Sequence, residues 1–375
     1  MTIGRIIFVV VFLSVIALAN LYVYRRFFRQ LSPRLHRTGA VLMSLIMIGE
    51  LLFVLDMATG LFPESLAIYI ILSSLLGTTF ILFVVALIYD LTLSVSRRVP
   101  FNQERRRTVK VIFDTAMLIA AISYLGIGFY NGTKEPEVND VVVSIEGFPF
   151  SGFTIVHLTD VHIGRTVKKE FLERIVAKSN SMHPNMVVIT GDLYDLPPDE
   201  IADDLEPLKK LKAPTYFVTG NHEYFHGVEA ILESVSSLGI TPLNNKATRF
   251  GNNNNYFNLV GLNDIIGLRT GKLPPDANLA YQGVDQTKPT IVLSHQPRSI
   301  FLVKDKRCDL MLSGHTHGGQ IFPFGLLVKL AQPFVAGLHE FDKGKQIFVS
   351  RGTGYWGPPL RVLAPSEISR IVITN

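Results

Sequence analysis

The 375-residue sequence predicts an α/β fold class, with a four-helix N-terminal membrane region followed by a layered α/β sandwich. Three observations predict it. The first third of the chain is strongly apolar, the rest alternates short apolar runs with helical patterns, and polar side chains that can bind metal follow several of those runs. A chain longer than about 200 residues commonly holds more than one domain, so we expect at least two units.

Four apolar stretches near the N-terminus are long enough to cross a bilayer, which takes about 20 residues. The first stretch and the run from Leu66 to Tyr89 carry no charge, whereas Glu50 and Asp56 lie in the second stretch and Asp114 in the fourth. Charged residues within such helices are candidates for a functional role. The first stretch could also be an uncleaved signal, because no clear small-residue cleavage site follows it. We predict a membrane region over residues 1–130 with helices at 6–24, 40–58, 66–90 and 111–130.

Basic residues predict the orientation of these helices. Arginines follow the first helix, Arg and Lys residues follow the third, and the segment from Thr59 to Ser65 between helices two and three has none. Loops rich in Lys and Arg stay on the cytoplasmic side. The N-terminus and everything after Tyr130 are therefore expected on the extracytoplasmic face of the cell (inner) membrane, in a multi-pass protein.

The charge balance excludes a nucleic-acid partner. Residues 1–134 hold 13 Lys and Arg against 6 Asp and Glu, while residues 135–375 hold 23 against 25. Binding of nucleic acid needs a basic face on the soluble part, and the composition provides no basic excess there. A single cysteine, Cys308, cannot form an intrachain disulfide, so we expect the outer domain to be held by its own core and by metal.

The soluble part begins after a polar segment, residues 131–140, that we interpret as a linker. Residues 141–375 are the predicted globular domain. Its expected strands are 153–158, 186–190, 216–219, 256–260, 291–293, 310–312 and 347–349, and its expected helices are 167–180, 199–211 and 228–238. This alternation favours a layered α/β domain with a largely buried sheet. The Asn-rich run Gly251–Asn255 is typical of a surface hairpin tip.

Five of the expected strands end in polar motifs. In chain order these motifs are TDVH at 159–162, GDLYD at 191–195, GNHE at 220–223, SHQP at 294–297 and SGHTHGGQ at 313–320. Ligands of open α/β sheets bind beyond the carboxyl ends of the strands, so all five motifs should gather at one edge. On an irregular loop, the two histidines of the last motif can converge on one point, and the glycines let the backbone turn tightly around them.

The side chains of these motifs form a mixed oxygen and nitrogen ligand set without thiolates, which suits two divalent ions such as Mn, Fe or Zn. The candidate metal ligands are Asp160, His162, Asp192, Asn221, His295, His315 and His317. Five of the ten histidines lie in the motifs. The other five (His36, His157, His183, His226 and His339) have no comparable setting and are expected to be structural or solvated.

The order DxH, GDxxD, GNHE, a lone His and GHTH resembles the calcineurin-like metallophosphoesterase superfamily. The ending GHTHGGQ and the segment SRGTGYWGPPLR at 350–361 resemble its membrane-associated bacterial branch, which includes UDP-2,3-diacylglucosamine pyrophosphatase-type hydrolases. The resemblance covers roughly residues 141–374. It implies a first ion held by Asp160, His162, Asp192 and His317, and a second held by Asn221, His295 and His315, with Asp192 bridging the two.

The resemblance also implies catalytic roles. A metal-activated hydroxide would attack phosphorus, His222 would protonate the leaving oxygen, and Asp195 would orient His222. From the residues alone, Asp195 could instead be a helix cap or turn residue. Phosphoprotein phosphatases of this superfamily carry an arginine after GDxxD, whereas Leu196 stands here, so a guanidinium clamp on phosphate is missing at that position.

The expected function is a membrane-anchored, dinuclear-metal phosphoesterase that acts on a phosphoester or pyrophosphate bond of a phosphorylated lipid or lipid-linked substrate. An apolar segment, residues 321–334, follows the last ligand. This segment could be a lip that admits an acyl or isoprenoid chain, with Tyr355 and Trp356 beside it, or it could be ordinary core packing plus a surface hairpin. The alternative function is a membrane sensor whose outer domain binds a ligand without turnover.

Overall fold

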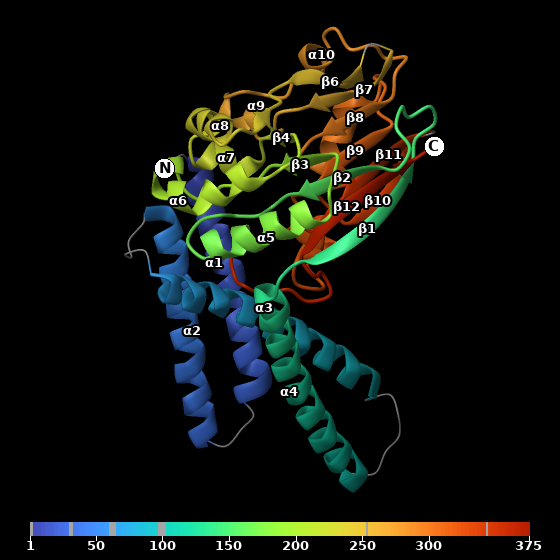
Figure 1. Cartoon of the computed structure of the whole chain (residues 1–375). Helices are drawn as coiled ribbons and strands as arrows, with labels where there is room; N and C mark the ends of the chain where they lie inside the picture. The colour runs from blue at the N-terminus through green and yellow to red at the C-terminus, as the bar shows by residue number, and fades with distance from the viewer. Residues whose placement is uncertain (1–2, 30–32, 60–64, 97–102, 253, 343) are drawn as a thin grey trace. The chain divides into compact units, whose positions relative to one another are not determined.

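The computed structural model describes residues 3–29, 33–59, 65–96, 103–252, 254–342 and 344–375. The chain forms two compact units (Figure 1). One comprises Met1–Tyr130 with Gly357–Leu360, and the other comprises Asn131–Trp356 with Arg361–Asn375.

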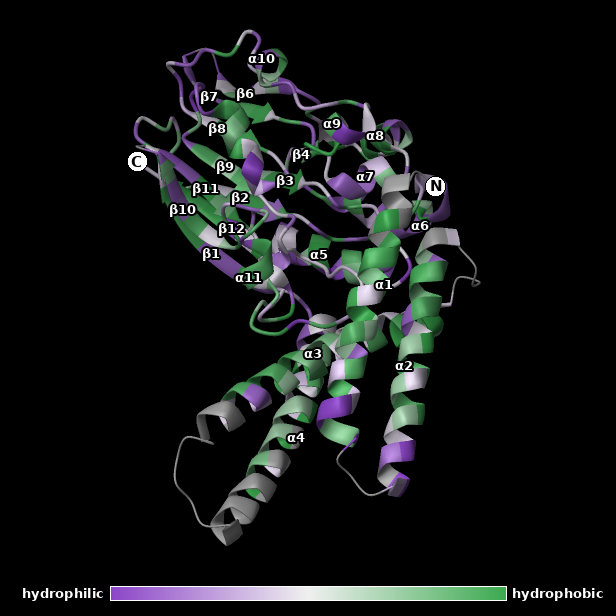
Figure 2. Ribbon diagram, turned by 180° about the vertical axis from the view of Figure 1, so that it is seen from behind, coloured by the Kyte–Doolittle hydropathy of each residue, from purple (hydrophilic) through white to green (hydrophobic). Residues whose placement is uncertain are grey.

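The first unit is helical. Its helices are α1 (Ile3–Val23), α2 (Pro33–Thr59), α3 (Leu66–Ser96) and α4 (Gln103–Thr133), and a π-helical turn, Tyr24–Phe28, continues α1. Figure 2 shows that apolar residues dominate these helices. In the described part of the chain, four segments are long and apolar enough to cross a membrane: Val9–Phe28, His36–Met57, Leu66–Thr92 and Thr115–Thr133. Each of the four predicted apolar helices is present, and α2 and α4 begin earlier than expected.

A polar cluster lies inside this unit. The Asn20 side-chain amide donates to Glu50 Oε2 at 2.6 Å, and Thr79 Oγ1 donates to Asn20 Oδ1 at 3.4 Å. The cluster joins α1, α2 and α3, and Glu50 is fully buried. Interhelical hydrogen bonds of this kind stabilise helix pairs in an apolar environment. Asp56 is also buried, whereas the side chain of Asp114 lies outside the described residues.

The second unit contains two six-stranded sheets (Figure 1). The first has the order β1-β12-β2-β3-β4-β5, formed by Glu137–Ser144, Glu367–Thr374, Phe153–Leu158, Met186–Thr190, Thr215–Val218 and Thr241–Pro242. The second has the order β10-β11-β9-β8-β7-β6, formed by Gly337–Asp342, Lys345–Val349, Leu310–Ser313, Thr290–Leu293, Asn255–Gly261 and Lys246–Asn252. Strands β2, β3 and β4 pair in parallel, as do β7, β8 and β9.

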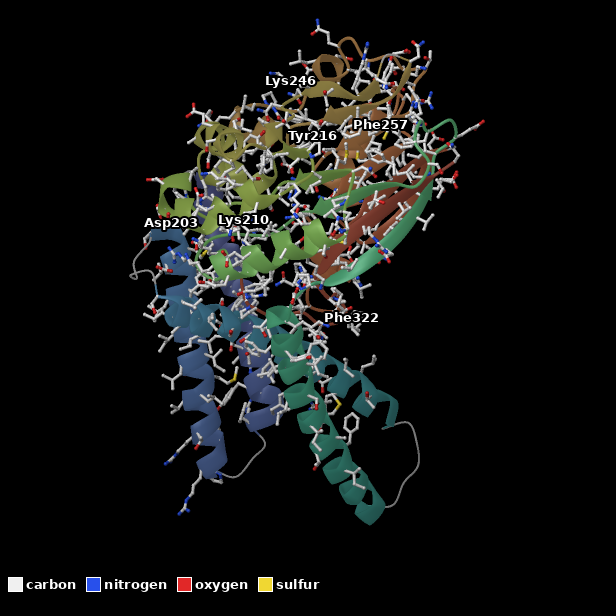
Figure 3. All side chains as sticks on the ribbon, in the orientation of Figure 1. Asp203, Lys210, Tyr216, Lys246, Phe257 and Phe322 are labelled. Carbon is white, nitrogen blue, oxygen red and sulfur yellow. The ribbon has the colours of Figure 1, made fainter. Side chains whose placement is uncertain are left out.

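The two sheets share one core because their central strands are apolar on both faces. In β2, Phe153 and Ile155 join the core between the sheets, whereas Val156 and Leu158 face the outer helices. Successive side chains of a strand point to opposite faces, so a strand covered on both sides becomes a continuous apolar run. Phe257 on β7, labelled in Figure 3, belongs to the same central core.

Helices cover both outer faces of the sandwich. Residues of α5 (Lys169–Ser181), α6 (Ala202–Leu205) and α8 (Val228–Ser237) pack with β2 and β3, and residues of α10 (Ala277–Ala280) pack with β7, β8 and β9. Three further short helices, α7 (Asn221–Phe225), α9 (Gly267–Thr270) and α11 (Gly325–Val328), follow β4, β7 and β9. The order of layers is helix, sheet, sheet, helix, as expected for an α/β sandwich.

Two expectations differ from the structure, and one agrees with it. The segment taken as a linker over residues 131–140 is shorter, since α4 runs to Thr133 and β1 begins at Glu137. The helix expected over 199–211 is broken into a 3-10 turn, the short α6 and a second 3-10 turn at Glu206–Lys210, which starts next to Pro207. The hairpin of β6 and β7 has its tip in the predicted Asn-rich run, of which Asn253 is outside the described residues.

Candidate metal centre

The five polar motifs lie directly after β2, β3, β4, β8 and β9. Because β2, β3 and β4 run in parallel in one sheet, and β8 and β9 in the other, the motifs meet at one edge of the sandwich. Backbone hydrogen bonds connect the loops directly: Asp160 N–H donates to Gly191 O, and His162 N–H donates to Asp192 O. The first and second motifs therefore hold each other in position before any metal is considered.

Three of the predicted ligands form one group. Asp160, His162 and His317 each offer a ligand atom, and these atoms lie within 4.8 Å of one another. The Nε2 atoms of His162 and His317 are 3.1 Å apart, and His317 Nε2 is 3.3 Å from Asp160 Oδ1. The backbone N–H of His315 donates to both oxygens of Asp160, at 3.0 and 2.9 Å, and thereby fixes the carboxylate.

Asp192, His295 and His315 form the second group, again with ligand atoms within 4.8 Å. His295 Nε2 lies 3.1 Å from Asp192 Oδ2 and 3.2 Å from His315 Nδ1. His295 Nδ1 lies 2.8 Å from Thr190 O, so it donates to that carbonyl and the ring directs Nε2 toward Asp192. Asp192 is also grouped with His162 and His222 within 4.8 Å, which places its carboxylate between the two sets.

Two further observations fit a site built for cations. Asn221 Oδ1 is buried and has no hydrogen-bond partner, although a buried amide oxygen normally has one. In addition, five of the seven predicted ligands have positive φ, namely Asp160 (52°), His162 (56°), Asp192 (50°), His315 (71°) and His317 (50°). Such conformations cost about 1–3 kcal/mol each and gather at functional sites. The residues present therefore fit a pair of divalent ions.

Glycines precede the ligands because the loops pack closely. A Cβ on Gly314 would lie 2.1 Å from Asp160 Oδ2, and a Cβ on Gly220 would lie 2.3 Å from Asp192 Oδ1. Neither carboxylate could stay in place beside an alanine. The motifs GHTH and GNHE therefore need glycine at these positions, because a ligand from a neighbouring loop approaches the backbone closely.

Asp195 contacts two histidines through a single oxygen. Its Oδ1 lies 2.7 Å from His162 Nδ1 and 2.7 Å from His222 Nδ1. Both rings therefore direct their Nε2 atoms away from Asp195, and His222 Nε2 is 3.9 Å from Asp192 Oδ2. The exposed rings of Phe225 and Trp356 stand edge-on to His222, with centroids 5.6 and 6.1 Å away.

Burial and charge set the protonation of these groups. Burial lowers the pKa of His315 to about 3 and that of His317 to about 4, so both rings are neutral and able to bind metal at neutral pH. Burial disfavours a charged Asp192, yet His295 and His222 outweigh it and hold the pKa of this carboxyl well below its usual range. Burial likewise disfavours a charged His222, but Asp192 and Asp195 raise its pKa to about 9. Metal cations bound next to His222 would disfavour its charged form and so lower its pKa.

Glu223, the last residue of GNHE, has a structural role that the sequence pattern does not reveal. Its fully buried carboxylate accepts the backbone N–H groups of Gly220, Asp192, Leu193 and Tyr194, at 2.6–3.2 Å. One side chain thus ties the third motif to the second. The convergence of four amide donors on one carboxylate reveals this role, and it can be seen only in the folded structure.

We expect Glu223→Ala to destabilise the second unit by about 3 kcal/mol or more, because four buried amide groups lose a charged acceptor. The measurement is the midpoint of thermal unfolding of the full chain. Glu233→Ala is the matched control, since Glu233 is an exposed glutamate on α8. Equal midpoints for the two variants would mean that Glu223 does not hold the loops together.

Sequence reasoning missed three other buried or partly buried groups near the site. Arg361 is fully buried, donates to Gly354 O, and places Nη2 3.1 Å from His317 Nδ1. Asp264 follows β7 and accepts Gln296 Nε2 at 2.9 Å. His226, expected to be structural or solvated, instead lies within 4.8 Å of Asp195 and His222. The strand-end pattern could have found Asp264, but nothing in the sequence marks Arg361 as buried.

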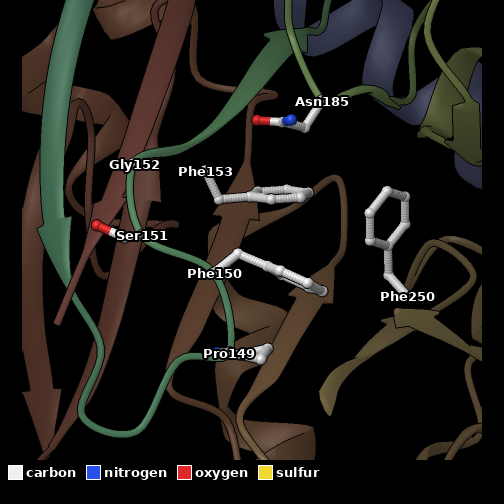
Figure 4. Close-up of a pocket in the computed structure, with 7 residues that line it drawn as sticks. All are labelled: Pro149, Phe150, Ser151, Gly152, Phe153, Asn185 and Phe250. Carbon is white, nitrogen blue, oxygen red and sulfur yellow. The ribbon is translucent and has the colours of Figure 1, made fainter. Parts of the chain in front are cut away.

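The described residues also line a hollow of about 510 Å³ at the start of β2, formed by Pro149, Phe150, Ser151, Gly152, Phe153, Asn185 and Phe250 (Figure 4). Aromatic rings and a few polar atoms make up its wall. It lies where β2 begins, whereas the predicted ligands follow the point where β2 ends. We therefore assign the chemistry to the metal centre, where titratable side chains converge, rather than to this hollow.

Comparison with known proteins shows the family to which the chain is similar. Residues 153–319 match the family model described as Calcineurin-like phosphoesterase. A Helicobacter pylori protein named "Uncharacterized metallophosphoesterase" is 38% identical over 87% of this chain and 86% of its own length. A Campylobacter jejuni protein, "Uncharacterized metallophosphoesterase Cj0846", is 32% identical over 97% of each chain. The Danio rerio "Transmembrane protein with metallophosphoesterase domain" is 37% identical over 72% of this chain and 63% of its own length.

The family model and the relatives describe a class of metal-dependent phosphoester hydrolases. The chain belongs to the calcineurin-like metallophosphoesterase family, as the sequence motifs predicted. This family uses a dinuclear metal centre, and the described residues include candidate ligands for it.

Proposed function

We propose that this chain is a membrane-anchored, two-metal phosphoesterase that hydrolyses a phosphoester or pyrophosphate bond of a lipid or lipid-linked substrate. The observation that carries the proposal is the position of Asp192. Its carboxylate belongs to one ligand group with His295 and His315 and to another with His162 and His222. A carboxylate shared by two groups of ligands is what a bridged pair of cations requires.

The ligands divide into two sets. Asp160, His162 and His317 would hold the first ion, and Asn221, His295 and His315 the second, with Asp192 between them. When bound, two divalent ions clamp phosphoryl oxygens as Lewis acids and lower the pKa of water, so that hydroxide is available at neutral pH. The donor set suits Mn, Fe or Zn.

His222 is the proposed general acid. Asp195 lies 2.7 Å from its Nδ1, so the ring is held with Nε2 directed toward the centre. A proton on Nε2 can pass to the leaving oxygen as the bond to phosphorus breaks. Asp195 also contacts His162 Nδ1, so it would position the acid and one metal ligand together.

The membrane helices support a lipid substrate. A covalent anchor raises the concentration of the active site near the bilayer, which favours substrates that are themselves in the bilayer. Leu196 is largely buried where phosphoprotein phosphatases have an arginine, so no guanidinium is available there to grip a phosphoprotein. From the arginine-rich loops we propose that the catalytic domain lies on the extracytoplasmic face of the inner membrane. Reporter fusions at either end of the chain would test this orientation.

Release of nitrophenol from bis- and mono-nitrophenyl phosphate tests the proposed activity. We expect added manganese to raise the rate of the full chain, and Asn221→Ala to lower it about a hundredfold, because removing one ligand weakens the second ion. Asn278→Ala, at an exposed position on α10, is the matched control. The preferred nitrophenyl compound would separate diester from monoester hydrolysis. Absence of metal-dependent turnover on either compound would favour the membrane sensor instead.

A further inference from the structure

We propose that the chain touches the bilayer a second time, through an apolar lip next to the metal centre that inserts among lipid acyl chains. The apolar lip consists of residues 322–330, which include α11, together with Leu363. The inference concerns an interaction surface and goes beyond the proposed hydrolysis. It depends on the exposure of the lip, its attachment to the ligand loop and the length of the tether to the last membrane helix.

The lip exposes large apolar side chains at adjacent positions. Leu326 is 60% exposed, Leu327 56%, Leu330 84% and Leu363 76%. Single exposed leucines are common on soluble proteins, whereas a contiguous group of them marks a surface that contacts protein or membrane. Leu326, Leu327 and Leu330 are therefore surface residues, so core packing does not describe this part of segment 321–334. In Figure 2 the ribbon at α11 has the green of hydrophobic residues.

The lip is firmly attached to the metal centre. It begins right after the 3-10 turn His317–Gly319, and a Cβ on Gly319 would lie 2.4 Å from Gly325 Cα. Phe322 N–H donates to Val362 O at 3.2 Å, which places Leu363 beside the lip. At its far end Gln332 is buried, donates to Gln296 Oε1 at 3.0 Å, and accepts Arg298 N–H at 3.1 Å. The backbone is thus held at both ends while the leucines face outward.

The short tether favours the bilayer as the binding partner of the lip. The span Thr115–Thr133 ends with α4, and only Lys134, Glu135 and Pro136 precede β1. Four peptide steps extend at most about 14 Å, so the sandwich cannot leave the membrane surface. A leucine-rich turn on a domain tethered this closely to the bilayer meets lipid far more often than any soluble partner. Lys329, which is exposed within the lip, suits the boundary between headgroups and acyl chains, because its ammonium can reach headgroups while the leucines enter the acyl region.

Site-specific fluorescence tests the inference in the full chain reconstituted in lipid nanodiscs. Leu327→Cys is labelled with an environment-sensitive nitrobenzoxadiazole dye. Leu279→Cys serves as the control, because Leu279 is a similarly exposed (52%) leucine on α10. Cys308 is buried, and burial raises the pKa of its thiol to about 12, so the introduced cysteine is labelled selectively. Nanodiscs with and without doxyl-labelled lipid are compared.

The expected result is a shorter emission wavelength at position 327 and loss of most of its fluorescence with doxyl lipid, with neither change at position 279. Equal, water-like emission at both positions would overturn the inference. A blue-shifted emission at 327 that doxyl lipid does not quench would also overturn it, because a protein surface, such as a second copy of the chain, would then cover the lip. The readout needs no turnover, so failure of the proposed hydrolysis does not affect it.

Discussion

Asp192→Asn is expected to remove both metal ions and to lower phosphoester hydrolysis at least about a thousandfold, since two-metal clamping contributes several kcal/mol to the transition state. The asparagine amide has the shape of the carboxylate, but its nitrogen cannot bind a cation and its oxygen carries no full charge. Asp192 Oδ2 lies 3.1 Å from His295 Nε2, so the ligand set on that side loses its anion. The measurements are metal content by mass spectrometry and the rate with manganese.

Asp305→Asn is the matched control, because Asp305 is an exposed aspartate after the 3-10 helix Pro297–Val303. It should retain full metal content and rate. If Asp192→Asn kept two ions per chain and a normal rate, Asp192 would not be the bridge, and the proposed division of ligands would have to be abandoned.

His222→Asn is expected to lower kcat about 10²- to 10⁴-fold for a substrate with an alkyl leaving group and to leave nitrophenyl substrates much less affected. General acid catalysis contributes an effect of this size only where the leaving oxygen needs a proton, and nitrophenolate leaves without one. Metal content should stay unchanged, since the proposed sets do not include His222. The measurement compares kcat for the two substrates at one pH, together with metal content.

His183→Asn provides the control for the general acid, because His183 is exposed and outside the metal centre. Loss of metal in His222→Asn would assign His222 to the ligands, in keeping with its grouping with His162 and Asp192. An equal loss for alkyl and nitrophenyl substrates would argue against proton donation.

The site was predictable because its ligands follow short strands that are apolar on both faces. Runs such as Met186–Thr190 can be recognised without any knowledge of pairing, and the polar residue after each run identifies the strand end. The edge strands were not predictable in the same way. β1 pairs with β12 across more than 200 residues, and most of its side chains are exposed. Its first half, Glu137–Asp140, is polar apart from Val138 and therefore has the composition of a linker.

Other features could not be predicted because they depend on long-range packing. Arg361 contacts His317, 44 residues away, and its buried guanidinium donates to the backbone carbonyls of Gly354 and Ala364. Glu223 likewise accepts backbone amides of residues about 30 positions earlier. The positive φ of Asp160, Asp192 and His317 results from loops that must turn to bring ligands from two sheets together.

Anomalous X-ray diffraction from crystals of the full chain grown with manganese tests the central claim most directly. The account predicts two peaks about 3.5–4 Å apart. Asp192 would lie between them, with Asp160, His162 and His317 around one peak and Asn221, His295 and His315 around the other. A single peak, or two peaks that do not share Asp192, would contradict it.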